Sequence, residues 1–305
     1  MRVIELRPTR CAICHTEGNA TELYAANFDP QAFNPVVFSA RRLPDRIHYR
    51  MVKCNTCGLV RSDPVADLEV LAKLYTQSTC DYDGEMTNLK LTYGQYLDKL
   101  AKYGVKNAAL LEIGCGNGFF LEEALSRGYD TVRGLEPSVA SVEKANPQVR
   151  PHIICDIMRP GLLEAEQFDV ICMFQVLDHI PNPGPLIDGC FNTLKPGGLM
   201  LCINHNIEAI SARLLKDRSP IIDIQHTYLY SPDTMRRFLL AHHFQIREVG
   251  PVSNRYSLYY LLRLVPLPIR LKRIILASIR NKLIGQMTLA LPLGNLYLIA
   301  QKPNS

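Results

Sequence analysis

The stretch Leu110-Leu-Glu-Ile-Gly-Cys-Gly-Asn-Gly-Phe119 decides the fold of this 305-residue chain. Its apolar beginning predicts a buried strand, and its three glycines predict a turn tight enough for the backbone to approach another molecule closely. Apolar residues then recur at helical spacing over residues 119–125, which predicts a helix directly after the turn. Such a helix begins with unpaired N–H groups, which can face a polar ligand.

An acid follows at the spacing typical of a nucleotide-binding sheet. The segment Val132-Arg-Gly-Leu-Glu136 predicts the next strand, with Glu136 at its tip, where such a sheet holds ribose hydroxyls. The glycine spacing GxGxG differs from the GxGxxG form expected for NAD or FAD. A dinucleotide oxidoreductase is therefore a distant alternative, which binding of NAD would reveal.

The glycine stretch resembles the cofactor loop of class I S-adenosylmethionine-dependent methyltransferases, and two later segments resemble the same family. Residues 168–183 are similar to its fourth strand and following loop, and residues 194–204 are similar to its Lys-Pro-Gly-Gly turn and fifth strand. The resemblance covers residues 108–250, about half of the chain. It implies an α/β fold with a Rossmann-like, seven-stranded sheet, and methyl transfer from S-adenosyl-L-methionine.

The resemblance also implies cofactor contacts. In this family the glycine loop holds the methionine part of the cofactor, an acid after the second strand binds the ribose, and an acid after the third strand often meets the adenine. The residues expected to bind the cofactor are Glu112, Gly114, Gly116, Gly118, Glu136, Asp156 and Gln175. Two alternatives stay open: Glu112 as a solvated carboxylate at a strand end, and Asp156 as a turn or helix-cap aspartate.

Two Cys-x-x-Cys units lie near the N-terminus, formed by Cys11 with Cys14 and by Cys54 with Cys57. Four thiolates that leave no open position are typical of a structural Zn²⁺ site. The alternative is two unrelated pairs of buried cysteines. A redox pair is disfavoured because no thioredoxin-like βαβ unit is predicted nearby. His15 could replace one ligand, although four thiols suffice.

Length and composition suit a globular protein with a small extra module. The chain has 47% hydrophobic and 21% charged residues, as ordinary globular proteins do. We expect a zinc-binding module at 1–64, a helical linker that covers the cofactor pocket at 65–107, and the methyltransferase domain at 108–305. Because no apolar signal segment or membrane-spanning run is found, a cytoplasmic location with reduced thiols is expected.

A Cys₄ module ahead of this cofactor loop resembles bacterial zinc-containing methyltransferases, several of which act on sugars. The resemblance implies a saccharide, nucleotide-sugar or lipid-linked glycan intermediate as acceptor. Sugar C-methyltransferases of this type carry a Tyr-x-Glu-His-like motif before an aromatic-rich Ser turn. His226 and Ser231 match that motif, whereas Asp223 and Gln225 stand in place of its Tyr and Glu. An oxygen acceptor therefore fits no worse than a carbon acceptor.

Two histidines are candidates for the base that methyl transfer to oxygen requires. His179 follows the predicted fourth strand, and His226 lies on a loop before a helix expected over 232–242. Histidine can act as a base near neutral pH. The alternatives are a loop histidine that only closes the cofactor pocket, for His179, and a packing residue at the helix entry, for His226.

A long apolar and basic insertion lies between the predicted sixth and seventh strands, at 244–249 and 296–300. The whole chain carries a net charge of only +5. Residues 254–294 contain no acid, and their cations are Arg255, Arg263, Arg270, Lys272, Arg273, Arg280 and Lys282. Three interpretations remain open. The segment is a lid over a phosphate-bearing acceptor, a contact with an anionic membrane surface, or a dimer surface and ordinary packed core.

Two other functions compete with a small-molecule methyltransferase. An RNA methyltransferase would use the cysteine module to grip nucleic acid, but residues 1–64 have little clustered charge, so a nucleic-acid partner is not expected. Salt-dependent RNA binding would favour it. A cofactor-binding scaffold would bind the cofactor tightly without turnover.

Overall fold

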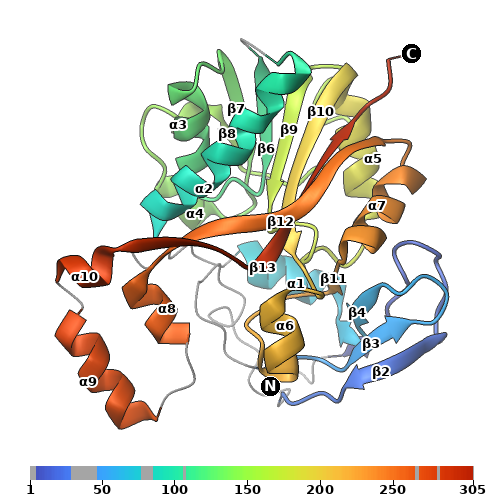
Figure 1. Cartoon of the computed structure of the whole chain (residues 1–305). Coiled ribbons are helices and arrows are strands. Elements are labelled where there is room, and N and C mark those ends of the chain that lie inside the picture. The colour runs from blue at the N-terminus through green and yellow to red at the C-terminus, as the bar shows by residue number, and fades with distance from the viewer. Residues whose placement is uncertain are drawn as a thin grey trace.

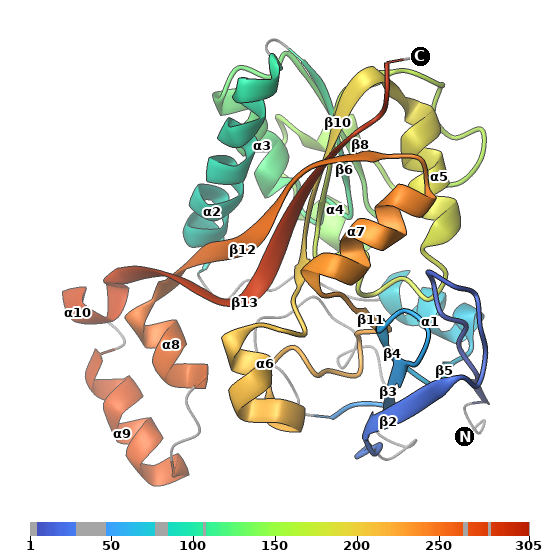
Figure 2. The same cartoon turned by 45° about the vertical axis from the view of Figure 1, so that its right-hand side comes forward.

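The computed structural model describes residues 5–28, 47–76, 85–105, 108–264, 268–279 and 282–304. In this part of the chain, one sheet has the strand order β12-β13-β10-β9-β6-β7-β8, a second has the order β11-β4-β3-β2, and β1 pairs with β5. Helices cover both faces of the large sheet, and the smaller sheet lies beside one of its ends (Figures 1 and 2).

The centre of the large sheet is parallel. It consists of β6 (Ala109–Ile113), β7 (Thr131–Leu135), β8 (Ile153–Ile154), β9 (Phe168–Phe174) and β10 (Leu194–His205). Strand β13 (Thr288–Gln301) runs antiparallel to both β10 and β12 (Gln245–Ser257). The expected seven-stranded, Rossmann-like α/β fold is thus confirmed. The central strands are mostly apolar because helices cover them on both faces.

Helices on the two faces form separate parts of the core. On one face lie α2 (Met86–Asp98), the 3₁₀ helix η2 (Lys99–Tyr103), α3 (Phe119–Ser126) and α4 (Val139–Glu143); on the other lie α5 (Gly184–Thr193) and α7 (Pro232–Ala241). The helix expected over 232–242 is α7, and the hydroxyl of Ser231, directly before it, forms a capping box with Thr234.

The smaller sheet joins the N-terminal cysteine module to a distant segment. It contains β2 (Ala20–Tyr24), β3 (Met51–Cys54), β4 (Val60–Ser62) and β11 (Tyr228–Leu229), and β11 pairs with β4 in antiparallel register. Strands β1 (Leu6–Arg7) and β5 (Val65–Ala66) and helix α1 (Leu68–Thr76) complete this region. The module expected at 1–64 therefore shares its sheet with residues that directly follow His226. The domain boundaries at 64 and 107 remain predictions.

The predicted sixth and seventh strands were too short. Strands β12 and β13 form an antiparallel ribbon that runs from Gln245 opposite Gln301 to Ser257 opposite Thr288, with two register shifts along it. The ends of the 254–294 segment are therefore strand, and the connection between them consists of α8 (Leu258–Leu264), α9 (Ile269–Ile279) and α10 (Leu283–Gln286). The outer half of β12 shows no clear apolar pattern and is held partly by polar contacts with α2 and the residue before it.

Those contacts come from three side chains on or just before α2. The hydroxyl of Thr92 accepts a hydrogen bond from Arg255 N at 3.0 Å, and that of Tyr96 accepts one from Ser253 N at 2.9 Å. The buried Glu85 carboxylate accepts a hydrogen bond from the Ser257 hydroxyl. Among the residues that the structure describes, no helix is both long and apolar enough to pass through a bilayer.

Candidate active site and cysteine cluster

The glycine loop lies at the carboxyl edge of β6, where parallel sheets of this kind bind ligands. Gly114, Gly116 and Gly118 all adopt left-handed backbone angles, with φ of 71°, 55° and 73°. A Cβ on Gly114 would lie 2.7 Å from Val176 Cγ2, and one on Gly118 would lie 3.0 Å from Ile153 Cδ1. The loop therefore has both the strain and the crowding that require glycine.

Two buried acids flank this loop. Glu136 is 9% exposed, and its carboxylate accepts hydrogen bonds from Gly116 N at 2.9 Å and Ser138 N at 2.8 Å. Burial raises the pKa of Glu136, and these two N–H groups offset part of the increase. Burial also raises the pKa of Glu112 well above its ordinary value, and the charge of Glu136 raises it further.

Glu112 is not the solvated strand-end carboxylate that the sequence left open. Its side chain is 3% exposed, and its Oε2 has no hydrogen-bond partner among the described residues. A buried polar atom without a partner is costly in a folded protein. An atom of this kind beside a glycine loop is a candidate ligand contact, and its cofactor role remains a prediction.

The other two predicted cofactor residues also lie at this edge. Asp156 follows β8; its carboxylate binds Arg159 Nη2 at 2.9 Å and accepts a hydrogen bond from Ile157 N at 2.8 Å. The Arg159 guanidinium lowers the pKa of Asp156 below its ordinary value. These local contacts also suit the alternative that Asp156 is a turn aspartate. Gln175 follows β9 with φ of 57°, a conformation that is uncommon for a residue with a side chain. Their roles stay predictions.

Together these groups fit S-adenosyl-L-methionine. The cofactor's amino-acid part is polar at both ends and its ribose presents two hydroxyls. The edge offers a crowded glycine turn, the free N-terminus of α3 and two buried acids, one of which has an unpartnered oxygen.

A cluster of three histidines surrounds a buried aspartate at the same edge. Asp178 is fully buried, and its Oδ2 lies 2.5 Å from His205 Nδ1 while its Oδ1 accepts a hydrogen bond from Asn204 Nδ2 at 3.1 Å. The ring of His226 lies 4.3 Å from the ring of His205 and 4.9 Å from that of His179, between centroids. The two predicted histidines are thus neighbours.

The strand order explains why this cluster and the glycine loop meet. Strands β6, β9 and β10 are adjacent and parallel, so their carboxyl ends share one edge. The glycine loop follows β6, His179 follows β9 and His205 ends β10. The closeness of Gly114 to Val176, on the loop that carries His179, connects the two groups directly.

Electrostatics favour a neutral imidazole at His226. Burial lowers the pKa of His226 well below its ordinary value, and the neighbouring His205 and His179 lower it further. Burial also lowers the pKa of His179. For Asp178, burial alone would raise the pKa, but His205 and the other imidazoles outweigh burial and hold it well below its ordinary value. The aspartate is therefore ionised at neutral pH.

The orientation of His226 leaves one ring nitrogen available. Its Nδ1 lies 2.8 Å from the carbonyl oxygen of Ile221, a geometry in which Nδ1 carries the proton and donates it to the carbonyl. Nε2 of the neutral ring then has a free lone pair. This is the arrangement of a general base.

His205 and Asp178 are further candidate functional residues, which the sequence motifs did not indicate. The signal for His205 was its position at the end of the fifth strand, on the ligand-binding edge. The signal for Asp178 was its place next to His179 after an adjacent strand. Asp178, His179 and His226 also place one ligand atom each within 4.8 Å of one another, a spacing that a metal ion could bridge.

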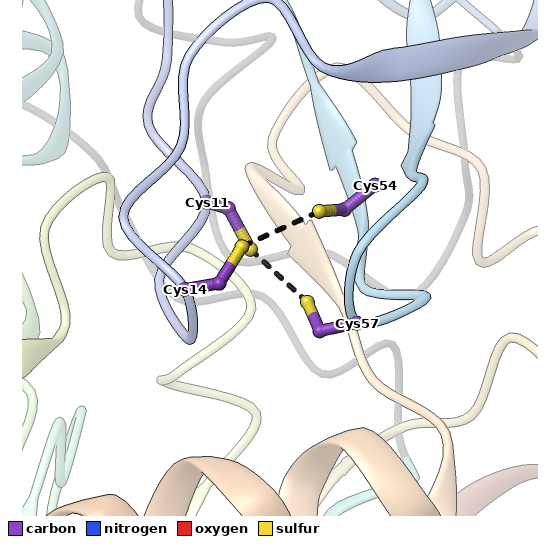
Figure 3. A group of neighbouring side chains, drawn as sticks. All are labelled: Cys11, Cys14, Cys54 and Cys57. Atoms are coloured by element: carbon purple, nitrogen blue, oxygen red, sulfur yellow. Dashed lines mark hydrogen bonds between the residues drawn. The ribbon is translucent and has the colours of Figure 1, made fainter.

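The four predicted thiols converge in the N-terminal module (Figure 3). The Sγ atoms of Cys11 and Cys57 are 3.3 Å apart, those of Cys14 and Cys54 are 3.5 Å apart, and all four lie within 4.8 Å of one another. Burial alone would raise the pKa of Cys54, but the N–H groups of Cys57 and Thr56 outweigh it and bring the pKa to about 6. The set fits a tetrahedral Zn²⁺ ion, and the exposed His15 is not needed.

Comparison with known proteins supports the sequence resemblance at the level of the domain. A family model described as a methyltransferase domain matches residues 86–249. A ubiquinone biosynthesis O-methyltransferase of Psychrobacter cryohalolentis is 30% identical over 118 residues, which cover 35% of this chain and 46% of the relative. The protein of the same name from Histophilus somni is 29% identical over 153 residues, covering 46% of this chain and 63% of the relative.

These matches span between about half and two thirds of each relative's length. Their names indicate O-methylation in ubiquinone biosynthesis, whereas the resemblance of the sequence pointed to saccharide enzymes. The saccharide expectation thus receives no support from them.

Two solved structures share the fold. A chain of the complex between the Haloferax volcanii Trm112 methyltransferase activator and a methyltransferase has a TM-score of 0.52 at 14% identity, covering 72% of this chain and 95% of that chain. The [4+2]-cyclase SpnF has a TM-score of 0.50 at 18% identity, covering 70% of this chain and 81% of that chain. A likeness at such identities shows the fold alone.

Proposed function

The chain belongs to the methyltransferase domain family, and from this premise we propose that it transfers a methyl group from S-adenosyl-L-methionine to a hydroxyl oxygen of a small-molecule acceptor. One observation carries the choice of oxygen. His226 lies at the carboxyl edge beside the glycine loop, and its Nε2 is free to accept a proton. The ionised, buried Asp178 lies next to it and favours the protonated ring. A hydroxyl acceptor must lose a proton, and this cluster can take it.

The bound cofactor would supply a methyl group already activated on a sulfonium. The protein's part is to align the acceptor and to move its proton. His226 Nε2 would accept the proton of the hydroxyl as the acceptor oxygen takes the methyl group, and the cofactor would be left as the neutral thioether S-adenosylhomocysteine. The negative charge of Asp178 favours the imidazolium that results. The proton then passes to water.

A phenol-like hydroxyl suits this base best. A phenol has a pKa near 10, much closer to that of an imidazole than the pKa of an aliphatic sugar hydroxyl, so proton transfer to His226 is easier. The O-methyltransferase name of the curated relatives points the same way. A saccharide or lipid-linked glycan acceptor is the second candidate, and its only support is the resemblance of the cysteine module.

The cysteine cluster completes the proposal as a structural site. Four thiols and no open position suit a Zn²⁺ ion that stabilises a fold and takes no part in the reaction. The ion would fix the turn between β3 and β4, and β4 pairs with β11 directly after His226. The module would thereby hold the base in place.

Calorimetric titration of the purified protein with S-adenosylhomocysteine, with NAD as the control, is the first test. Binding of S-adenosylhomocysteine alone is expected, and NAD binding or no binding would contradict the cofactor assignment. Transfer of labelled methyl groups is then measured on hydroxylated aromatic amphiphiles, saccharides and RNA. Product on the aromatic class supports the proposal; product on RNA alone, or tight cofactor binding with no product on any class, would replace it with the corresponding alternative.

A matched pair of variants tests the base. His226→Gln should lower kcat by about 10²- to 10⁴-fold while cofactor affinity is kept. His152→Gln is the control, because His152 is exposed just before β8 and is not part of the histidine cluster. Equal rates for the two variants would remove His226 from the mechanism.

A further inference from the structure

The connection between β12 and β13 forms an outlying unit, here called the basic hairpin and defined as residues 254–264, 268–279 and 282–294. Figures 1 and 2 show its helices α8, α9 and α10 projecting from the body of the molecule at the end of the ribbon. Strand β10 ends at His205, opposite Asn295 of β13, and the ribbon continues past that point to Ser257 and Thr288. The basic hairpin therefore extends from the same sheet edge that carries the glycine loop and the histidines.

Large apolar side chains are exposed on the basic hairpin. Nearly half of the exposed large hydrophobic residues in the described part of the chain lie here: Leu271, Ile274, Leu283, Ile284, Met287 and Leu289. Leu283 is 86% exposed and Ile274 is 68% exposed. A concentration of this kind on one outlying unit marks a surface that another body covers.

The exposure is not a sign of a loosely attached segment. The base of the ribbon is held to α2 by the contacts of Glu85, Thr92 and Tyr96 described above. At its far end, Gly285 is buried, and a Cβ there would lie 2.2 Å from the carbonyl oxygen of Ile279. Helix α10 thus packs closely against the end of α9 and leaves its apolar side chains outward.

Cations lie among these apolar groups. On α9, exposed Arg270 and Arg273 alternate with exposed Leu271 and Ile274, and exposed Lys282 precedes Leu283. Within the described ranges, Arg270, Arg273 and Lys282 form no ion pair. Residues 254–294 contain no acid at all, and Arg280, another of their seven cations, lies outside the described residues.

This combination selects one partner. Nucleic acid would match the cations but would leave the side chains of Ile274 and Leu283 in water. A folded protein partner would need a large, uniformly negative surface. An anionic bilayer matches both, because apolar side chains enter the interface while Lys and Arg reach the headgroups. We propose that the basic hairpin docks on the surface of an anionic phospholipid bilayer.

The docking does not depend on the reaction proposed above, and it has a consequence for it. The hairpin extends from the carboxyl edge of the sheet, so docking places that edge near the lipid. An acceptor dissolved in the bilayer would then reach the site without crossing bulk water.

Flotation of the full chain with vesicles tests the proposal. Phosphatidylcholine vesicles are compared with vesicles of equal parts phosphatidylcholine and phosphatidylglycerol, at low and high salt. Binding is expected to the anionic vesicles and to weaken with salt, because the Debye length shortens. Equal binding to both vesicle types, or binding to neither, would overturn the proposal. Binding of short single-stranded RNA with no vesicle binding would assign the surface to nucleic acid instead.

Surface variants separate the two contributions. Arg270→Gln with Arg273→Gln should weaken vesicle binding about thirtyfold, and Ile274→Ser with Leu283→Ser about tenfold or more. Leu214→Ser is the matched control, because Leu214 is 76% exposed on α6 (Ile210–Leu215), outside the hairpin. All variants should keep S-adenosylhomocysteine affinity, which shows that they fold. Vesicle binding unchanged in both double variants would refute the docking surface, whatever the enzyme activity.

Discussion

The hydroxyl of Ser62 donates a 2.7 Å hydrogen bond to the backbone carbonyl oxygen of His226. The neighbouring carbonyl, that of Thr227, accepts a 2.8 Å hydrogen bond from Ser62 N. Ser62 ends β4, Cys54 ends the neighbouring strand β3, and Cys57 lies in the turn between them. The cysteine module therefore holds the main chain of the proposed base at two successive peptide groups, although the residues lie far apart in the sequence.

Removal of the metal should impair catalysis before it impairs cofactor binding. The four cysteines fix the module, which contacts the His226 loop, whereas the glycine loop belongs to β6 and α3. A displacement of about 1 Å at a reacting group can cost about 100-fold in rate. We expect chelation to release Zn²⁺, measured by atomic absorption, and to lower kcat by about 10- to 100-fold while S-adenosylhomocysteine affinity is kept.

The matched variants for this experiment are Cys14→Ser with Cys57→Ser and, as control, Cys155→Ser, an exposed thiol outside the cluster. The control should keep both its metal content and its rate. Loss of cofactor binding together with the metal would mean that the module builds the cofactor pocket, and a metal content of zero in the untreated protein would remove the zinc site.

Ser62→Ala tests the connection itself. The substitution removes the donor to the His226 carbonyl, and a lost hydrogen bond in a buried region costs about 1 kcal/mol of stability. We expect a small drop in Tm and a drop in kcat that is larger than any change in cofactor affinity. Ser278→Ala is the control, because the Ser278 hydroxyl donates to Ile275 O at an exposed position on α9. Equal kinetics in the two variants would show that Ser62 is structural only.

Gly114→Ala should abolish cofactor binding through crowding at the loop. Its Cβ would lie 2.7 Å from Val176 Cγ2, in addition to the cost of φ at 71°. Gly128→Ala is a matched control: Gly128 has φ of 85°, but a Cβ there meets nothing within 4 Å. Both variants lose about 1 kcal/mol or more to backbone strain, and calorimetry should show loss of S-adenosylhomocysteine binding in Gly114→Ala alone.

Unchanged affinity in Gly114→Ala would place the cofactor elsewhere. Gly116→Ala extends the test, since Gly116 has φ of 55° and its N–H donates to Glu136. It too should lose cofactor binding.

Glu112→Gln should make the folded protein more stable at neutral pH and weaken its binding of the cofactor. Burial and Glu136 raise the pKa of Glu112, so the folded protein binds a proton that the unfolded chain releases above the ordinary pKa. Folding stability from this group is therefore fully present below that ordinary pKa and is lost as pH rises through the raised one. An amide has no such dependence. We expect Glu112→Gln to raise Tm at neutral pH, with the gain shrinking towards pH 4, and to weaken cofactor binding.

Thermal unfolding of both proteins across this pH range measures the effect. A parallel shift of Tm at every pH would show that Glu112 keeps its ordinary pKa. Unchanged S-adenosylhomocysteine affinity would remove Glu112 from the cofactor site.

Those parts of the molecule that local sequence patterns determine could be predicted from the sequence. Three glycines on one loop, the start of α7 and the paired Cys-x-x-Cys units all depend on neighbours within a few residues, and the structure has them where they were expected. The pairing of β11 with β4 and the contact between His205 and Asp178 depend on residues distant in the chain. No local pattern encodes such contacts.

The outer part of β12 was missed for a related reason. A strand is recognised by the apolar face that it buries. Beyond the edge of the large sheet, Ser253, Arg255 and Ser257 are held by hydrogen bonds to α2. Their periodicity is that of a polar ribbon with one strand partner, and the strand prediction therefore stopped where the sheet core ends.

The pH dependence of methyl transfer should report the ionisation of His226. Burial and the two neighbouring imidazoles lower its pKa well below the ordinary value of 6.5, so the neutral base persists through neutral pH. We expect kcat/KM for a phenolic acceptor to be level from neutral pH down to below pH 6.5 and to fall only in more acidic solution.

Folding stability should also fall in acidic solution, because a lowered histidine pKa means that the unfolded chain takes up the proton at a higher pH than the folded protein. The contribution of His226 to stability is present above pH 6.5 and is lost as pH falls through the lowered pKa. In His226→Gln the acidic limb of the rate profile should disappear together with most of the rate, whereas His152→Gln should keep both. An acidic limb centred at or above pH 6.5 in the unmodified protein would show that His226 is not the group that takes the proton.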